Sequence, residues 1–150
     1  MGSEYYFLKS KRDGDVVDVS FGNTAASTPL IAYRPNTPRT DNQLWGFILT
    51  GNVPYLFITV KQTGQVIDIR DANEAPGTPL VAYPQKVSGT DNQLWLFVPS
   101  DDTTYFFITS KLAGGVITLE GPKQENGTPL VARPRKPSDN DDQLWSLVPA

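Results

Sequence analysis

The sequence lacks two residue types on which much enzyme chemistry depends. None of its 150 residues is a histidine or a cysteine. Without cysteine the chain forms no disulfide and has no thiolate nucleophile. Without cysteine and histidine it has neither of the usual side-chain ligands of structural zinc. Without histidine there is no Ser-His-Asp or Cys-His catalytic pair. An enzyme built on this chain would have to use carboxylates, lysine, tyrosine or an oxygen-ligated metal, so we expect no enzyme.

Long apolar runs and excess positive charge are also missing. The longest apolar runs, such as residues 46–49, are a handful of residues long, whereas a membrane-spanning helix needs about 20. We therefore expect no membrane insertion. The formal net charge is −3 at pH 7, and nucleic-acid binders normally carry a basic face, so we expect no nucleic-acid partner. An N-terminus without a basic and apolar leader, in a chain without cysteine, predicts a cytoplasmic protein.

What the sequence does contain is a threefold repeat. The period is fifty residues, no gaps are needed, and the units are 1–50, 51–100 and 101–150. The matching positions include Tyr5/Tyr55/Tyr105, Phe7/Phe57/Phe107, Lys11/Lys61/Lys111, Gly14/Gly64/Gly114, Val16/Val66/Val116, Thr-Pro-Leu at 28–30, 78–80 and 128–130, and Asp-x-Gln-Leu-Trp at 41–45, 91–95 and 141–145. Matches at so many positions with one spacing indicate a single domain of three equivalent units.

Each unit has the pattern of four short β-strands. In the first unit, aromatic or β-branched segments at 5–10, 16–19, 30–33 and 44–48 are separated by turn residues. Asp13-Gly14 is a hairpin signal between the first two segments. With 13 prolines and 12 glycines in the chain, no long helix is expected.

Three units of four strands predict an all-β fold, the β-trefoil. A propeller has four to eight blades, and a solenoid needs capping ends. A trefoil has a six-stranded barrel capped by three hairpins, and closure removes exposed sheet edges. We therefore predict one β-trefoil over residues 1–150, with pseudo-threefold symmetry.

The ends of the units carry a family resemblance. Gln43-Leu44-Trp45, Gln93-Leu94-Trp95 and Gln143-Leu144-Trp145 resemble the Gln-x-Trp repeat of the ricin B chain and its relatives, the R-type lectins, and the resemblance covers essentially the whole chain. The absence of cysteine departs from the plant members and is similar to the cytosolic lectins of this fold in fungi and some bacteria. The resemblance implies carbohydrate binding without catalysis. The recurring tryptophan is interpreted as core packing around the pseudo-threefold axis.

The resemblance also implies which residues bind sugar. An aspartate at the end of the second strand accepts two sugar hydroxyls, an aromatic residue after the third strand stacks on the sugar, and an asparagine before Gln-x-Trp bonds a hydroxyl. The implied carbohydrate-binding residues, with the adjacent glutamines included, are Asp18, Tyr33, Asn42 and Gln43 in the first unit and Asp68, Tyr83, Asn92 and Gln93 in the second. The third unit has Thr118, Arg133 and Asp142 at the three positions, so all three have changed together.

The chemistry of these residue types fits a neutral sugar. A carboxylate takes two hydroxyl donors, and an aromatic ring matches the C–H face of galactose. We therefore predict recognition of galactose or N-acetylgalactosamine glycans and glycoproteins without cofactor or metal. Carboxylates that ionise near pH 4 would lose binding below that pH.

Other interpretations remain open at this point. The aspartates could satisfy loop amides, and the tyrosines could be ordinary surface aromatics. Asp41, Asp91 and Asp141 persist in all units and are interpreted as structural turn or loop caps. The alternative functions are a non-catalytic interaction or assembly subunit on the same fold, and a trefoil protease inhibitor. A homo-oligomer or a protein partner is also possible.

Overall fold

The computed structural model describes residues 4–51 and 53–150, and within them the chain forms twelve β-strands and five one-turn 3-10 helices. Their bounds are β1 Tyr6–Ser10, β2 Val16–Val19, η1 Ser20–Gly22, β3 Thr28–Tyr33, η2 Asp41–Gln43, β4 Trp45–Leu49, β5 Leu56–Val60, β6 Val66–Ile69, η3 Arg70–Ala72, β7 Thr78–Tyr83, η4 Asp91–Gln93, β8 Trp95–Pro99, β9 Phe106–Ser110, β10 Val116–Leu119, β11 Thr128–Arg133, η5 Asp141–Gln143 and β12 Trp145–Pro149. The strand pattern predicted from the first unit is therefore confirmed in all three.

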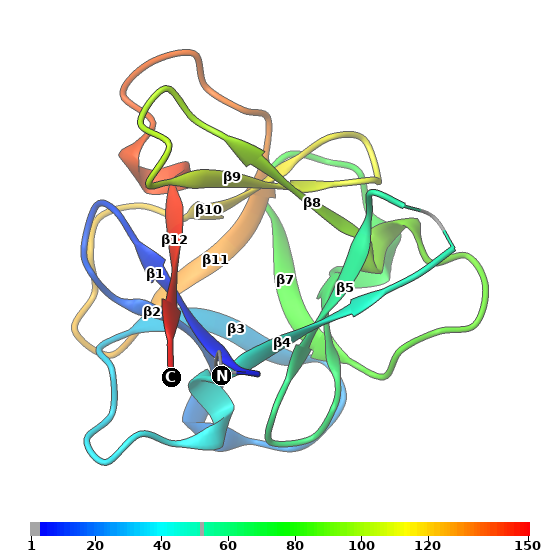
Figure 1. Cartoon of the computed structure of the whole chain (residues 1–150), viewed down its shortest axis with the longest axis horizontal. Coiled ribbons are helices and arrows are strands. Elements are labelled where there is room, and N and C mark those ends of the chain that lie inside the picture. The colour runs from blue at the N-terminus through cyan, green and yellow to red at the C-terminus, as the bar shows by residue number, and fades with distance from the viewer. Residues whose placement is uncertain (1–3, 52) are drawn as a thin grey trace.

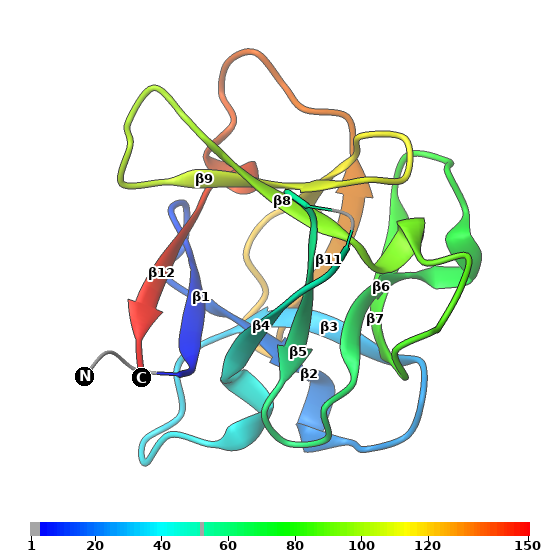
Figure 2. The same cartoon turned by 45° about the vertical axis from the view of Figure 1, so that its right-hand side comes forward.

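Six strands close into a barrel and six form its cap, so the predicted β-trefoil is confirmed. The barrel ring runs β1–β4–β5–β8–β9–β12 and returns to β1, with every neighbouring pair antiparallel. The cap hairpins β2–β3, β6–β7 and β10–β11 meet through mutual pairing of β3, β7 and β11. Figures 1 and 2 show the three units around one axis, with β1 and β12 side by side.

The core is built on one tryptophan from each unit. Trp45, Trp95 and Trp145 are at most 1% exposed. Each indole Nε1–H donates to a carbonyl in the second strand of its own unit, at 2.9 Å to Val17, 2.9 Å to Ile67 and 3.0 Å to Ile117. A buried indole needs such an acceptor. The interpretation of these tryptophans as core residues is confirmed.

The persistent aspartates link neighbouring units. Asp41, Asp91 and Asp141 are the first residues of η2, η4 and η5, and the N-cap positions before them are held by Thr40, Thr90 and Asn140. Their carboxylates instead form ion pairs with lysines, at 3.6 Å to Lys61, 3.3 Å to Lys111 and 3.2 Å to Lys11. The prediction of turn caps was wrong, because these side chains point to the next unit around the barrel. A structural role in all three units still holds.

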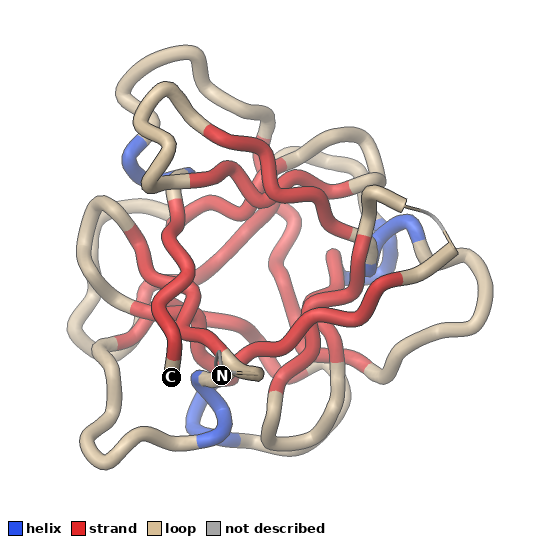
Figure 3. The backbone as a smooth tube through the Cα atoms, in the orientation of Figure 1, coloured by secondary structure: helices blue, strands red, loops and turns tan. Residues whose placement is uncertain are grey.

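Figure 3 shows that the strands converge on the centre while loops and short helical turns occupy the periphery. In the part of the chain that the structure describes, no helix has the length and apolar character to cross a bilayer. No group of three or more carboxylates arranged for a metal ion occurs there either.

Candidate functional site

The first unit holds a buried carboxylate at the end of β2. All four residues of β2 are buried, and Asp18 is only 3% exposed. Its Oδ1 accepts a hydrogen bond from Asn42 Nδ2 at 3.2 Å, and its Oδ2 accepts one from Gln43 Nε2 at 2.8 Å. Three of the predicted site residues are therefore brought together, from segments 24 and 25 residues apart.

Asn42 and Gln43 are consecutive residues of the 3-10 turn η2, so their two amides reach Asp18 together. Gln43 Nε2 also donates to the carbonyl of Arg34 at 2.9 Å, and Gln43 Oε1 accepts from the backbone N–H of Asn36 at 2.9 Å. Gln43 is 0% exposed and both ends of its amide are engaged. It therefore fixes the loop and orients Asp18, and it does not line the cavity above Asp18.

The carboxylate keeps capacity for a ligand. An ionised carboxylate has about four lone-pair positions, and two are taken by the amides, which leaves about two for incoming hydroxyls. Burial raises the pKa of Asp18 from 3.8 to about 6, although the hydrogen bonds from Gln43 and Asn42 oppose this. The expectation that this carboxylate ionises near pH 4 was wrong, because a buried carboxylate loses hydration.

A cavity of about 420 Å³ opens above Asp18. Pockets that hold small molecules measure about 300–1,000 Å³, so this one is large enough for a ligand. Its lining comes from all three units: Asp18, Phe21, Gly22, Ile31, Tyr33, Asn36, Thr40, Asp41, Asn42, Gln62 and Asn126. The Arg34 guanidinium lies 4.5 Å from the centroid of the Tyr33 ring. Because it covers one ring face, only the other remains for a sugar. We call this cavity site 1.

The second unit repeats the same arrangement, which we call site 2. Asp68 is 4% exposed and accepts from Asn92 Nδ2 at 3.2 Å and from Gln93 Nε2 at 2.9 Å. Burial raises the pKa of Asp68, while Gln93 and the charge of Lys86 lower it. Lys86 Nζ also donates to Asn92 Oδ1 at 2.7 Å. The cavity measures about 220 Å³ and is lined by Ser27, Asp68, Arg70, Asp71, Ala72, Val81, Tyr83, Lys86 and Asn92.

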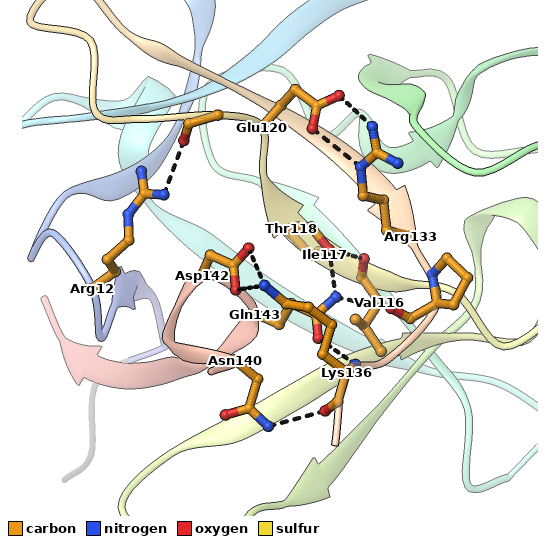
Figure 4. Close-up of polar contacts among 12 residues, drawn as sticks. Arg12, Val116, Ile117, Thr118, Glu120, Arg133, Lys136, Asn140, Asp142 and Gln143 are labelled. Carbon is orange, nitrogen blue, oxygen red and sulfur yellow. Dashed lines mark hydrogen bonds and ion pairs between the residues drawn. The ribbon is translucent and has the colours of Figure 1, made fainter. Parts of the chain in front are cut away.

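The third unit replaces this arrangement with internal contacts. Thr118 Oγ1 accepts from Gln143 Nε2 at 3.3 Å and donates to the carbonyl of Val116 at 2.9 Å. Arg133 binds Glu120 through two hydrogen bonds, and Lys136 binds Asp142 (Figure 4). Arg133 and Asp142, which replace the tyrosine and the asparagine, are therefore each paired with an oppositely charged side chain of the same unit.

Three of the site 1 residues that sequence reasoning missed come from positions where the repeat is not kept. Phe21, Gln62 and Asn126 line the cavity but lie outside the aligned motif positions. The residues fifty positions further along the repeat, around site 2, are of other types, so the repeat gave no reason to select these three. The available signal was the departure from the repeat itself, a phenylalanine where the other units have Asp71 and Gly121.

The fold and the two aspartate-centred cavities define a β-trefoil of the Gln-x-Trp class. The sequence model for the family described as ricin-type β-trefoil lectin domain-like matches residues 1–83 and, overlapping them, residues 41–133. The chain belongs to this family. A comparison with curated protein sequences finds no match.

Solved structures with the same fold include a designed protein and natural carbohydrate-active proteins. The designed threefold-symmetric protein ThreeFoil is 26% identical, with a TM-score of 0.85 over 97% of this chain and 98% of that one. A ricin B-like lectin of Macrolepiota procera in complex with lactose is 21% identical, with a TM-score of 0.78 over 99% and 96%. An exo-β-1,3-galactanase of Clostridium thermocellum is 24% identical, with a TM-score of 0.85 over 98% of this chain but only 30% of that one.

Proposed function

We propose that this protein is a non-catalytic lectin that binds terminal galactose or N-acetylgalactosamine through sites 1 and 2. One observation carries the proposal: both cavities expose a buried carboxylate whose two oxygens are already oriented by an asparagine and a glutamine. Such a pre-oriented acceptor pair suits two hydroxyls of one sugar ring, since little side-chain freedom is lost on binding. The lactose complex of the Macrolepiota lectin supports the choice of galactose.

The four types of residue contribute to sugar binding in different ways. Asp18 and Asp68 accept sugar hydroxyls, and Tyr33 and Tyr83 present a ring to the apolar face of the sugar. Asn42 and Asn92 border the cavities. The Nδ2 of each donates to its aspartate and to a backbone carbonyl, that of Val19 or Ile69, so each asparagine meets a ligand only as an acceptor through Oδ1. Gln43 and Gln93 lie beneath and act on binding by holding the aspartates in place.

The strength of each site follows from these contacts. A hydrogen bond to a charged group contributes about 1.5–3 kcal/mol. After the cost of association, two such bonds and one stacked ring correspond to dissociation constants of about 0.1–1 mM for a monosaccharide. The two sites belong to different units of the trefoil, so one short glycan would not bridge them, while a glycan-rich surface would engage both with added avidity.

The function proposed for these sites is binding without catalysis. A glycosidase needs a proton donor and a second carboxylate on either side of the bond it cleaves. In each site the aspartate is fixed by two amides that donate hydrogen bonds to it, which prepares it to accept hydroxyl protons in hydrogen bonds.

Calorimetric titration with galactose and N-acetylgalactosamine tests the proposal. The wild-type protein should show about two sites, Asp18→Asn and Asp68→Asn about one each, and the double variant none. Each substitution should weaken its own site by about 1–3 kcal/mol, which is about 5- to 150-fold. Thr118→Ala, at the equivalent position of the third unit, is the matched control and should change nothing. Full binding by the double variant would contradict the proposal. Sugar binding should also be unchanged by EDTA in every variant.

A further inference from the structure

Sites 1 and 2 share their central residues but differ in the walls around them. Site 1 is bordered by Phe21, Gln62 and Asn126, whereas the repeat places Asp71, Leu112 and Ala26 at the corresponding positions. Leu112 and Ala26 do not line site 2. The cavity volumes differ accordingly, about 420 Å³ against about 220 Å³. Two of the three differing residues of site 1, Gln62 and Asn126, come from the neighbouring units.

Phe21 is placed at a cost to the folded state. Its side chain is 94% exposed, and its backbone has a φ of 56°, in the left-handed region that non-glycine residues rarely adopt. An exposed phenylalanine returns little burial energy, so its packing within the chain does not compensate for this conformation. Phe21 does line the cavity of site 1, where a ligand ring would cover it.

The turn between β5 and β6 fixes the loop that carries Phe21. Gln62 Nε2 donates to the carbonyl of Gly22 at 2.9 Å, and Gln65 Nε2 donates to the carbonyl of Thr24 at 3.4 Å. The second unit therefore holds the first unit's loop against the cavity. Within the described part of the chain, Gln62 Oε1 accepts no hydrogen bond, so this acceptor is available to a ligand hydroxyl.

The opposite wall comes from the third unit. Asn126 lines site 1, and the next residue, Gly127, packs so closely that an added Cβ would lie 2.6 Å from Ile31 Cδ1. The amide of Asn126 offers both a donor and an acceptor to hydroxyls. Site 1 thus has an aromatic ring and two amides outside the central Asp18, Tyr33 and Asn42.

From this arrangement we infer that site 1 is a composite site for a glycan of at least two sugar units. The inference rests on the proposed function, since the terminal sugar occupies Asp18 and Tyr33 as described above. The second sugar packs on Phe21 and bonds the amides of Gln62 and Asn126. Site 2, which lacks all three, recognises the terminal sugar alone. The two sites of one chain therefore differ in selectivity, and only site 1 distinguishes glycans by the second sugar unit, the one linked to the terminal sugar.

Titrations with single-site variants test this inference. In the Asp68→Asn background, site 1 is titrated with methyl β-galactoside and with disaccharides that end in galactose, such as lactose and N-acetyllactosamine. At least one disaccharide should bind about tenfold more tightly than the monosaccharide. Adding Phe21→Ala should abolish that gain and leave monosaccharide affinity unchanged. The exposure of Phe21 makes this variant safe for folding, and its melting temperature verifies that.

Site 2 provides the matched control. In the Asp18→Asn background, monosaccharide and disaccharides should bind alike. Equal affinities for monosaccharide and every disaccharide at site 1, or an equal loss of both on Phe21→Ala, would overturn the composite site while the proposed function stands. Failure of all sugars, including the monosaccharide, to bind at either site would overturn the proposed function and this inference with it.

Discussion

The buried carboxylate of site 1 makes sugar binding sensitive to pH near neutrality. Burial raises the pKa of Asp18 to about 6. Only the ionised form offers both oxygens as acceptors, so apparent affinity follows the ionised fraction. That fraction is about 97% at pH 7.5 and about 9% at pH 5 for a pKa of 6. Affinity at site 1 should therefore fall about tenfold across this range. A carboxylate with an ordinary pKa near 3.9 would lose less than about 10%.

Calorimetry on the Asp68→Asn variant with galactose at pH 7.5, 6.0 and 5.0 measures this directly. Because binding selects the ionised carboxylate, complex formation at pH 5 should also release about one proton, which buffers of different ionisation enthalpy reveal. The Asp18→Asn variant, which retains site 2, should show a decline in the same direction, because the pKa of Asp68 is also raised. A site 1 affinity that changes by less than about twofold between pH 7.5 and 5 would mean that the ionisation of Asp18 does not control binding.

Three further predictions concern stability. The folded-state pKa of Asp18, about 6, lies above its ordinary 3.8, so its stabilising contribution is complete below about pH 4 and is lost as pH rises through about 6. The free energy of unfolding in urea should therefore decline between pH 4 and 7, and Asp18→Asn should remove up to about 3 kcal/mol of that decline. Trp45→Phe should lower the free energy of unfolding in urea by about 2–4 kcal/mol, because it leaves a void and removes the hydrogen bond to the Val17 carbonyl. Trp95→Phe should have the same effect, and a loss below about 1 kcal/mol would contradict the core packing. Asp41→Asn should cost less than about 1 kcal/mol despite recurring in every unit, since both ends of its ion pair with Lys61 are exposed; a larger drop in the same assay would show that the ion pairs hold the units together.

The repeat made the fold predictable, while the walls and charge states of the sites were not. Three copies of one strand pattern limit the architecture to closed threefold solutions, and a tryptophan kept in all three copies has to be core. Asp18 and Asn42 could be paired because both vary together between units. The hydrogen bond from Gln43 to Asp18, and the pKa of Asp18, depend on burial, which a repeat pattern does not encode. Phe21 joins site 1 through a loop held by another unit, so its role needed three-dimensional contacts.

The equivalence of Gln143 to Gln43 and Gln93 provides an internal control for the central claim, that sugars bind at the first and second units. Side-chain amide signals of these residues and of Asn42 and Asn92 can be followed by two-dimensional ¹H–¹⁵N NMR during titration with galactose. We expect the amide signals of Asn42, Gln43, Asn92 and Gln93 to shift and saturate with sugar, while that of Gln143 does not move. Shifts confined to other surfaces, or no shifts at tens of millimolar sugar, a concentration well above the roughly 0.1–1 mM dissociation constants expected, would contradict it.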